Sequence, residues 1–176
     1  MVSALADGMA LADPSLRTEV RGLVSSGERP ADILTMGALP GVRTAIDVTI
    51  AAPDALHAGT DACAAAYRRK MTRYSHILPA LRRAGVVFQP VVWSAEGRPH
   101  PATVRVMDCT VRMVRTRRGP EAAAELQARW RHEVAIALQR RRAAMLRAVL
   151  PARGQRQEWL ARGGRLEVSD DARLPT

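Results

Sequence analysis

Aromatic side chains are too scarce in this chain to build the core of a large β-sandwich. The 176 residues include three tryptophans, two tyrosines and one phenylalanine, although 47% of the residues are hydrophobic. The core must therefore consist mainly of Ala, Val, Leu, Ile and Met side chains, which suits helices packed on a small sheet better than two large sheets. A chain of this length makes one domain of ordinary size, which buries enough surface to fold without a disulfide framework or a structural metal.

The spacing of apolar residues predicts an α/β domain with a small mixed sheet flanked by helices. Some segments repeat apolar residues every three or four positions, and others are short β-branched runs. The elements expected in chain order are a helix over 16–24, strands over 33–36 and 45–50 that form a hairpin through a turn at 39–41, a helix over 61–84, strands over 86–93 and 103–107, and a helix over 121–150. Pro79 predicts a kink or restart in its helix, and Pro90 indicates a bulged or edge strand.

Positive charge is concentrated after residue 60. Residues 1–60 carry four basic and seven acidic side chains, net −3, whereas residues 61–176 carry 23 basic and ten acidic side chains, net +13. A strongly basic body favours a polyanionic partner, and nucleic acid is the default. Of the 27 basic residues only Lys70 is a lysine. A coding bias toward arginine explains many of the others, which makes this one lysine more informative.

The sequence also predicts domain boundaries and the redox state of the compartment in which the protein lies. We expect an α/β core over 1–118, a long basic C-terminal helix over 119–151 packed on that core, and a flexible tail over 152–176. No apolar run approaches the roughly 20 residues of a membrane span, and the N-terminus lacks the pattern of a secretory signal. One bridge between Cys63 and Cys109 is conceivable, but two reduced thiols in a reducing compartment are the preferred interpretation.

Charged residues inside apolar segments are the sharpest functional indication. Lys70 stands on the apolar stripe of its helix, between two tyrosines, where it either extends to the helix edge or meets an acidic partner. Asp47 lies within an apolar strand, flanked by Ile46 and Val48, and Asp32 opens the strand before it. Two carboxylates and an ammonium compensate one another if they meet, and compensated buried charge is typical of a functional site.

Such a cluster has the parts that phosphodiester hydrolysis needs. Two carboxylates hold Mg²⁺ while leaving most of its coordination positions to water and phosphate oxygens. The metal lowers the pKa of a bound water, and an ammonium stabilises the negative charge that develops on the phosphate. The basic body would attract the polyanionic substrate.

The order and spacing of these residues resemble a known nuclease pattern. Arg29-Pro30-Ala31-Asp32 is followed after fourteen residues by Asp47-Val48-Thr49, and then by Lys70 with Tyr74 four positions later. This order resembles the PD-(D/E)XK nucleases and, more narrowly, the restriction-enzyme-like endonuclease domain of site-specific non-LTR retrotransposons. The strand around 88–92 is similar to the next strand of that family, so the resemblance spans roughly residues 16–110.

The resemblance implies a set of roles. Asp32 and Asp47 would be the metal ligands for Mg²⁺ or Mn²⁺, Lys70 the catalytic lysine, and Tyr74 an accessory catalytic group. The substrate would be DNA, with RNA or a reverse transcriptase of the parent element as further partners. An intracellular, nuclear location and a PD-(D/E)XK, restriction-endonuclease-like fold are expected on the same grounds.

Several arginines are expected to contact the phosphate backbone, with a solvated helix face as the alternative. They are Arg29, Arg69, Arg73, Arg115, Arg117, Arg118, Arg140, Arg141 and Arg142.

The chain also departs from the family pattern. Ala31 separates Pro30 from Asp32, where the family has Pro and Asp adjacent. Thr49 stands where most of the superfamily places its lysine, so only Lys70 can fill that role. A reverse transcriptase and a Cys/His zinc knuckle are missing, which is expected of an isolated domain, a truncated element copy or a stand-alone nuclease.

Two other functions remain open at this stage. One is an arginine-rich nucleic-acid-binding domain without catalysis, such as a decayed nuclease copy. The other is a structural helical module whose basic faces serve a protein partner.

Overall fold

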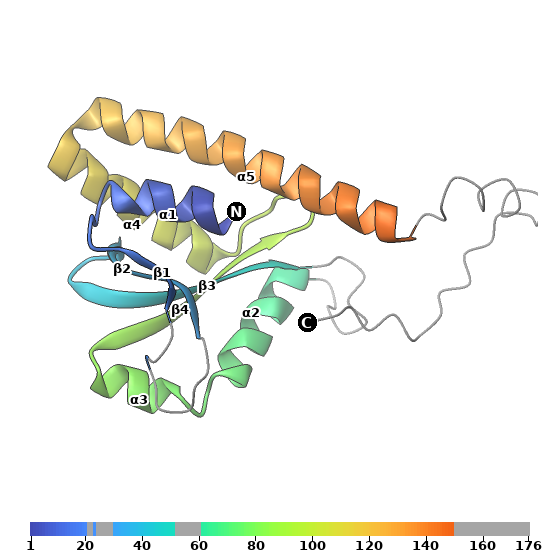
Figure 1. Ribbon diagram of the computed structural model, residues 1–176, viewed down its shortest axis with the longest axis horizontal. Helices are drawn as coiled ribbons and strands as arrows, with labels where there is room; N and C mark the ends of the chain where they lie inside the picture. Colours follow the sequence, from blue (N-terminus) through green and yellow to red (C-terminus); the bar gives the residue numbers. More distant parts are fainter. Residues whose placement is uncertain (21–22, 24–29, 52–60, 150–176) are drawn as a thin grey trace, which may run out of the picture. The chain divides into compact units, whose positions relative to one another are not determined.

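A four-stranded mixed sheet carries helices on both of its faces in the computed structural model, which describes residues 1–20, 23, 30–51 and 61–149 (Figure 1). The elements in chain order are α1 (Val2–Ala10), β1 (Arg17–Val20), β2 (Ala31–Leu39), β3 (Val42–Ala51), α2 (Ala62–Arg73), α3 (Leu78–Arg83), β4 (Val86–Ser94), α4 (Pro101–Arg118) and α5 (Pro120–Val149). The chain divides into a unit of Met1–Gln139, which holds the sheet, and a unit of Arg140–Thr176, which begins inside α5. The expected α/β class is confirmed.

The strands lie in the order β1-β2-β3-β4. The first two pairs are antiparallel and β3 pairs with β4 in parallel. The predicted hairpin is confirmed, because β2 and β3 are joined by a tight turn in which Gly41 adopts a φ of 69° that favours glycine. A parallel partner needs a crossover connection, and α2 and α3 supply it between β3 and β4.

The two faces of the sheet are covered by different helices. Ile33, Ile46 and Val91 lie in the larger apolar cluster, which includes residues of α1, α4 and the first part of α5. Ala45 and Phe88 alternate with them and contact the other layer, formed by α2 and α3 (Figure 1). Because neighbouring residues of a strand point to opposite faces, each strand contributes to both layers.

One expected helix is a strand. The sequence predicts a helix over 16–24, whereas β1 occupies Arg17–Val20 and pairs with β2, with Arg17 opposite Leu34. Only Val20 of the four strand residues is buried. The edge of β2 offers backbone hydrogen bonds that a short helix at this position cannot use, so tertiary pairing overrides the weak helical pattern.

One expected strand is a helix. The β-branched residues over 103–107 predict a strand, but they lie in α4, which begins with His100 as its N-cap and with Pro101 in its first turn. Thr103, Val106 and Thr110 are buried at the helical spacing. The apolar residues over the whole of α4 thus recur with the helical period. The five residues 103–107 are too few to distinguish this period from that of a strand.

The two longest predicted helices are confirmed in outline. The segment 61–84 forms α2 and α3, with Pro79 in the first turn of α3, and the segment 121–150 forms α5. The inner face expected for α5 is buried up to Leu138, while the side chains of Met145 and Val149 lie outside the described residues. The segment 152–176, expected as a flexible tail, also lies outside them, and the proposed domain boundaries stay a prediction.

The outer edge of β4 is closed from Pro90 onward. The backbone groups of Val92 point away from β3: its carbonyl accepts from His100 N (2.9 Å) and its N–H donates to Thr103 Oγ1 (2.7 Å). Ser94 N donates outward in the same way, to Arg98 O at 2.8 Å. Pro90 has the same orientation by alternation, and its carbonyl accepts from the side chain of Gln89 at 2.9 Å.

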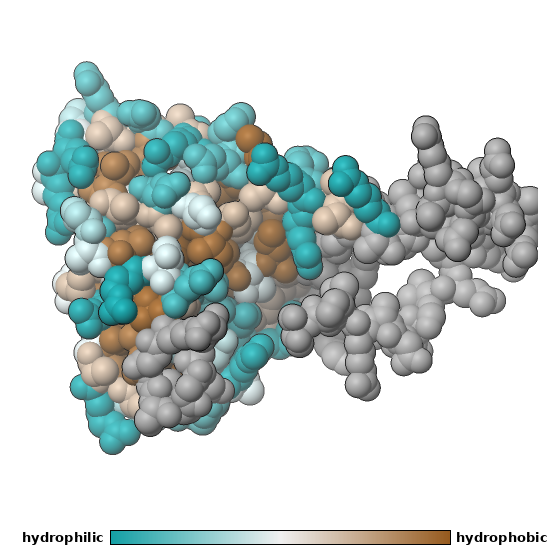
Figure 2. All heavy atoms as spheres, viewed as in Figure 1, coloured by the Kyte–Doolittle hydropathy of each residue, from teal (hydrophilic) through white to brown (hydrophobic). Residues whose placement is uncertain are grey.

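Polar side chains surround an apolar area on one face of the molecule (Figure 2). On the face shown in Figure 2, hydrophilic side chains line the periphery and apolar ones gather toward the centre. Cys63 and Cys109 are free thiols, as preferred above. Within the described part of the chain, no helix combines the length and apolar character that crossing a bilayer requires.

Asp13 ties the end of α1 to the middle of β2. Its carboxylate accepts four hydrogen bonds, from the backbone and side chain of Ser15 (3.0 and 2.6 Å), from Thr35 Oγ1 (2.7 Å) and from Met36 N (2.6 Å). Burial by itself would raise the pKa of Asp13, but these four donors together hold the pKa below its ordinary value.

The four hydrogen bonds accepted by Asp13 predict that acid lowers the stability of the protein. A carboxyl group whose pKa is lowered on folding stabilises the protein above its unfolded pKa, and that contribution disappears as pH falls through the folded pKa. Asp13→Asn should therefore lower the free energy of unfolding at pH 7 by about 1–3 kcal/mol. In Asp13→Asn the free energy of unfolding should also fall less steeply than in wild type between about pH 5 and pH 2, as measured by urea denaturation at each pH. Asp7→Asn, at an exposed position of α1, should keep the wild-type profile, and parallel profiles for wild type and Asp13→Asn would contradict this role.

Gly8 should not tolerate a methyl group. A Cβ built at Gly8 would lie 2.2 Å from Nε1 of Trp130, which is fully buried and donates a hydrogen bond to Ala4 O at 3.0 Å. Gly8→Ala should cost about 1–3 kcal/mol of stability, despite the better helix propensity of alanine. Ser3→Ala, at an exposed position of the same helix, should change stability by less than about 0.5 kcal/mol. A Gly8→Ala protein as stable as wild type in thermal denaturation would show that Trp130 is free to shift.

Candidate functional site

A polar cluster interrupts the apolar layer between α2 and the sheet. Along the covered face of β3, Ala45 belongs to an apolar cluster around Phe88, and Ala51 belongs to another around Cys63. Between these two positions the same face carries Asp47 and Thr49. The strand therefore presents polar groups at the place where α2 crosses it.

Lys70 of α2 reaches this position and pairs with Asp47. Its Nζ lies 3.0 Å from Oδ1 and 2.9 Å from Oδ2 of the carboxylate, so it contacts both oxygens. The side chain of Asp47 is 9% exposed and that of Lys70 is 23% exposed. The helical stripe that carries Lys70 thus turns an ammonium toward the sheet, where it meets an acidic partner.

Asp32 joins the pair from the neighbouring strand. In the antiparallel register Ile33 lies opposite Ile46, and one further step along the register places Asp32 opposite Asp47. Oδ2 of Asp32 accepts a hydrogen bond from the backbone N of Val48 at 2.7 Å. The structure therefore brings the three charged residues expected from the sequence to one place, although they are far apart along the chain.

Burial dominates the electrostatics of Asp47. Desolvation raises the pKa of Asp47 above its ordinary value, the ion pair with Lys70 opposes that rise, and the nearby negative charge of Asp32 adds to it. The loss of solvent and the negative charge of Asp32 together outweigh the effect of Lys70 on the pKa of Asp47. A second cation beside Asp32 and Asp47 would relieve this imbalance.

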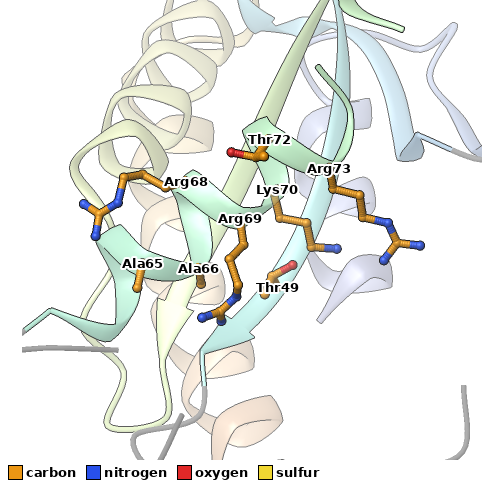
Figure 3. Close-up of a pocket in the computed structure, with 8 residues that line it drawn as sticks. All are labelled: Thr49, Ala65, Ala66, Arg68, Arg69, Lys70, Thr72 and Arg73. Carbon is orange, nitrogen blue, oxygen red and sulfur yellow. The ribbon is translucent and has the colours of Figure 1, made fainter. Parts of the chain in front are cut away.

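A pocket of about 840 Å³ opens beside this cluster. Its described lining consists of Thr49 on β3 and, on α2, of Ala65, Ala66, Arg68, Arg69, Lys70, Thr72 and Arg73. Figure 3 shows Arg69 and Lys70 reaching from α2 toward Thr49, with Arg68 and Arg73 directed to either side. The pocket wall is therefore strongly cationic, and its volume suits a substrate larger than a single ion.

Tyr74 lies in the core, in contrast to the three charged residues. It is 6% exposed, its ring packs edge-on against Phe88 with centroids 4.9 Å apart, and the guanidinium of Arg73 lies over it at 5.5 Å. These contacts give the ring a packing role. The accessory catalytic role implied by the resemblance stays a prediction.

The arginines expected to contact phosphate lie in several places. Arg69 and Arg73 are exposed at the pocket, and Arg115 is exposed on α4. The exposed Arg140, Arg141 and Arg142 belong to the second unit, and Arg29 lies outside the described residues.

Two of these arginines have an intramolecular role. Arg117 donates to the carbonyl of Ala12 through Nη1, and Arg118 Nε donates to the carbonyl of Leu11 at 3.0 Å. Both carbonyls lie just after α1, where a helix end leaves acceptors without partners. These side chains therefore hold α1 against α4, and their expected contact with nucleic acid stays a prediction.

Sequence reasoning did not assign a site role to Thr49 and Arg68. Thr49 Oγ1 lies 3.4 Å from Oδ2 of Asp47 and lines the pocket. The signal was available, since a residue two positions after Asp47 on a strand shares its face. The position of Arg68 at the pocket could not be predicted in the same way, because it depends on the direction in which α2 turns its basic side chains.

The N-terminal end of α2 is fixed to the loop after β4. Asp61 caps the helix by accepting from Ala64 N at 3.0 Å, and it forms a two-pronged ion pair with Arg98 at 2.7 and 3.3 Å. The ion pair with Arg98 and the cap lower the pKa of Asp61 to about 2. Tyr67 stacks on His100 with centroids 4.3 Å apart. These contacts hold α2 in the position that places Lys70 over β3.

Asp32 and Asp47 are the residues that suit a divalent cation. They supply oxygen donors from adjacent strands, and hard cations such as Mg²⁺ prefer oxygen ligands. Among the described residues no group of three or more His, Cys, Asp or Glu side chains is arranged to hold a metal. Comparison with protein-family models and with curated proteins finds no match for this chain.

The packing of Tyr74 predicts that its ring matters more for stability than its hydroxyl does. Tyr74→Ala should lower the free energy of unfolding by about 3–5 kcal/mol, because it empties a buried site. Tyr74→Phe keeps the ring and should cost less than about 1.5 kcal/mol, measured by chemical denaturation. Equal losses in the two variants would show instead that the hydroxyl makes the essential contact.

Proposed function

We propose that this protein is a metal-dependent DNA endonuclease that hydrolyses phosphodiester bonds at Asp32, Asp47 and Lys70. The observation that carries the proposal is the convergence of two carboxylates from adjacent strands, Asp32 and the buried Asp47, beside the ammonium of Lys70. Isolated buried charges are costly, so such a cluster favours a functional role. The mixed sheet and the helix crossover between β3 and β4 are consistent with the PD-(D/E)XK-like fold that the resemblance implies.

The donor set fits Mg²⁺ or Mn²⁺ held by two carboxylates. Asp32 and Asp47 would hold the ion and leave its other positions to water and to phosphate oxygens. Desolvation and the proximity of Asp32 raise the pKa of Asp47, which is the electrostatic setting that a bound cation relieves. The bound ion would supply a water of lowered pKa and charge neutralisation at the phosphate.

Lys70 has a donor left for the substrate. An ammonium carries three N–H groups, and two of them are sufficient for the contacts with Asp47. Lys70 also lines the pocket, so its remaining N–H can reach a phosphate oxygen there. Asp47 thus orients Lys70, and Lys70 stabilises negative charge that develops on the scissile phosphate.

The rest of the proposal follows from charge and from the resemblance. The cationic pocket and the net charge of +10 favour a polyanionic substrate. The place of action would be the nucleus, and the origin of the chain a retrotransposon-derived nuclease domain. RNA or a reverse transcriptase would be further partners in the parent element.

Nicking of supercoiled plasmid tests the proposal directly. The wild-type protein should nick the plasmid with Mg²⁺ or Mn²⁺, and EDTA should abolish the reaction. Asp32→Asn, Asp47→Asn and Lys70→Met should each lower the nicking rate by about 10²-fold or more. Asp108→Asn, which removes an exposed carboxylate of α4, should nick at the wild-type rate. Circular dichroism checks that each variant is folded.

Three results would contradict parts of this assignment. Nicking by Asp32→Asn at the wild-type rate would show that the metal site is placed wrongly. Nicking that survives EDTA would contradict metal dependence. If Lys70→Met lost DNA binding and cleavage equally, Lys70 would be a structural or binding residue and not a catalytic one.

One observation favours a second candidate, a nucleic-acid-binding domain without catalysis. Lys70 already contacts both oxygens of Asp47, which is the arrangement of a self-contained ion pair that needs no metal. Binding of DNA without nicking at any concentration of Mg²⁺ or Mn²⁺ would favour this candidate.

A further inference from the structure

Helix α2 concentrates positive charge in its second half. Over Ala62–Arg73 it carries four basic side chains and no acidic one. Lys70 is turned toward the sheet, whereas Arg68, Arg69 and Arg73 are exposed around the pocket. One helix therefore presents both the lysine of the candidate site and three exposed guanidinium groups around it, with Arg68 and Arg73 directed to opposite sides and Arg69 toward Thr49 (Figure 3).

This array is unfavourable for the isolated helix. Arg69 and Arg73 are four residues apart, where like charges repel, although the helix dipole favours cations in the last turn. Among the described residues, Arg68 and Arg69 have no acidic partner, in contrast to Arg98, which pairs with Asp61. Exposed guanidinium groups that have no acidic partner among the described residues and that line a pocket are suited to binding an external polyanion.

We propose that the exposed face of α2 docks the sugar–phosphate backbone of double-stranded DNA, with Arg68 and Arg69 as its main phosphate contacts. The inference rests on the proposed function for the choice of DNA as the polyanion. It adds the surface that binds the duplex, and it requires no divalent metal for binding. Thr49 and Thr72 line the same pocket and supply hydroxyl donors of the kind that contact phosphates.

The aromatic residues favour a duplex over a single strand. Proteins that hold single strands stack bases on exposed aromatic rings. Here Tyr74, Phe88, Trp93 and Trp130 are at most 6% exposed, and Tyr67 is stacked on His100. The described surface therefore offers charge and hydroxyl groups to a phosphate backbone but few rings to a base.

A matched pair of variants tests the inference. Arg68→Gln/Arg69→Gln removes two charges from α2, and Arg82→Gln/Arg83→Gln removes two exposed charges from the last turn of α3, the next helix. Binding of a fluorescent 25-base-pair DNA duplex is measured in EDTA over a series of salt concentrations, with circular dichroism as the folding check. The α2 variant should bind about tenfold more weakly or worse, and its slope of log K against log salt should fall by about 2. The α3 variant should bind within about twofold of wild type.

Each other outcome overturns the inference. An α2 variant that binds like wild type shows that the duplex docks elsewhere, and an equal loss in the α3 variant shows that only total charge matters. Tighter binding of the single strand, or of duplex RNA, than of duplex DNA overturns the choice of substrate.

Failure of the proposed function gives a different pattern. If wild type never nicks DNA but the α2 variant alone loses binding, the docking surface stands and the endonuclease assignment falls. If the α2 variant retains binding while wild type nicks DNA in a metal-dependent way, the reverse holds.

Discussion

The ion pair between Asp47 and Lys70 joins α2 to the sheet at the point where the apolar packing between them is interrupted. A carboxylate on the covered face of a strand loses its hydration, and this loss is costly unless hydrogen-bond donors or a cation replace the water. Lys70 meets that need, with Nζ 2.9 Å from Oδ2 and 3.0 Å from Oδ1. Replacing such a pair by well-packed apolar residues is often neutral or stabilising, so the ion pair is weak evidence for a contribution to stability.

The same ion pair fixes the direction of the other basic residues of α2. Successive residues of a helix are turned by about 100°, so a lysine directed at the sheet places its neighbours on the flanks and on the solvent side. Arg68 and Arg69 are exposed for this reason. The contacts of Asp61 with Arg98, and of Tyr67 with His100, then hold the helix at its other end. A single buried pairing and a fixed helix end thus define both the candidate site and the cationic surface beside it.

The sequence was sufficient for those features that depend on local patterns or on buried charge. The hairpin of β2 and β3 follows from an apolar run and a β-branched run on either side of a Pro-Gly turn. The convergence of Asp47 and Lys70 follows from the cost of leaving either alone in an apolar element. Asp32 could be added because it opens the strand next to Asp47. The resemblance to a nuclease pattern rests on the same residues.

The features that sequence reasoning missed depend on long-range contacts. Nothing local to β1 shows that it will complete the edge of β2, and nothing local to Arg117 and Arg118 shows that they will bind the carbonyls after α1. Asp13 likewise gains its partners Thr35 and Met36 only when β2 passes beside it. The error in α4 has another origin, because a five-residue window cannot separate a β-branched strand from one face of a helix.

The closed edge of β4 has a consequence for association between molecules. An open strand edge is a template for pairing with another chain, which leads to fibrils or to unintended dimers. From Pro90 to Ser94 this edge offers an incoming strand few free backbone groups. Pro90 has no N–H, and its carbonyl accepts a hydrogen bond within the molecule. Both backbone groups of Val92 and the N–H of Ser94 also form hydrogen bonds within the molecule. Over Pro90–Ser94, the edge of β4 is therefore protected against the addition of a strand from another molecule.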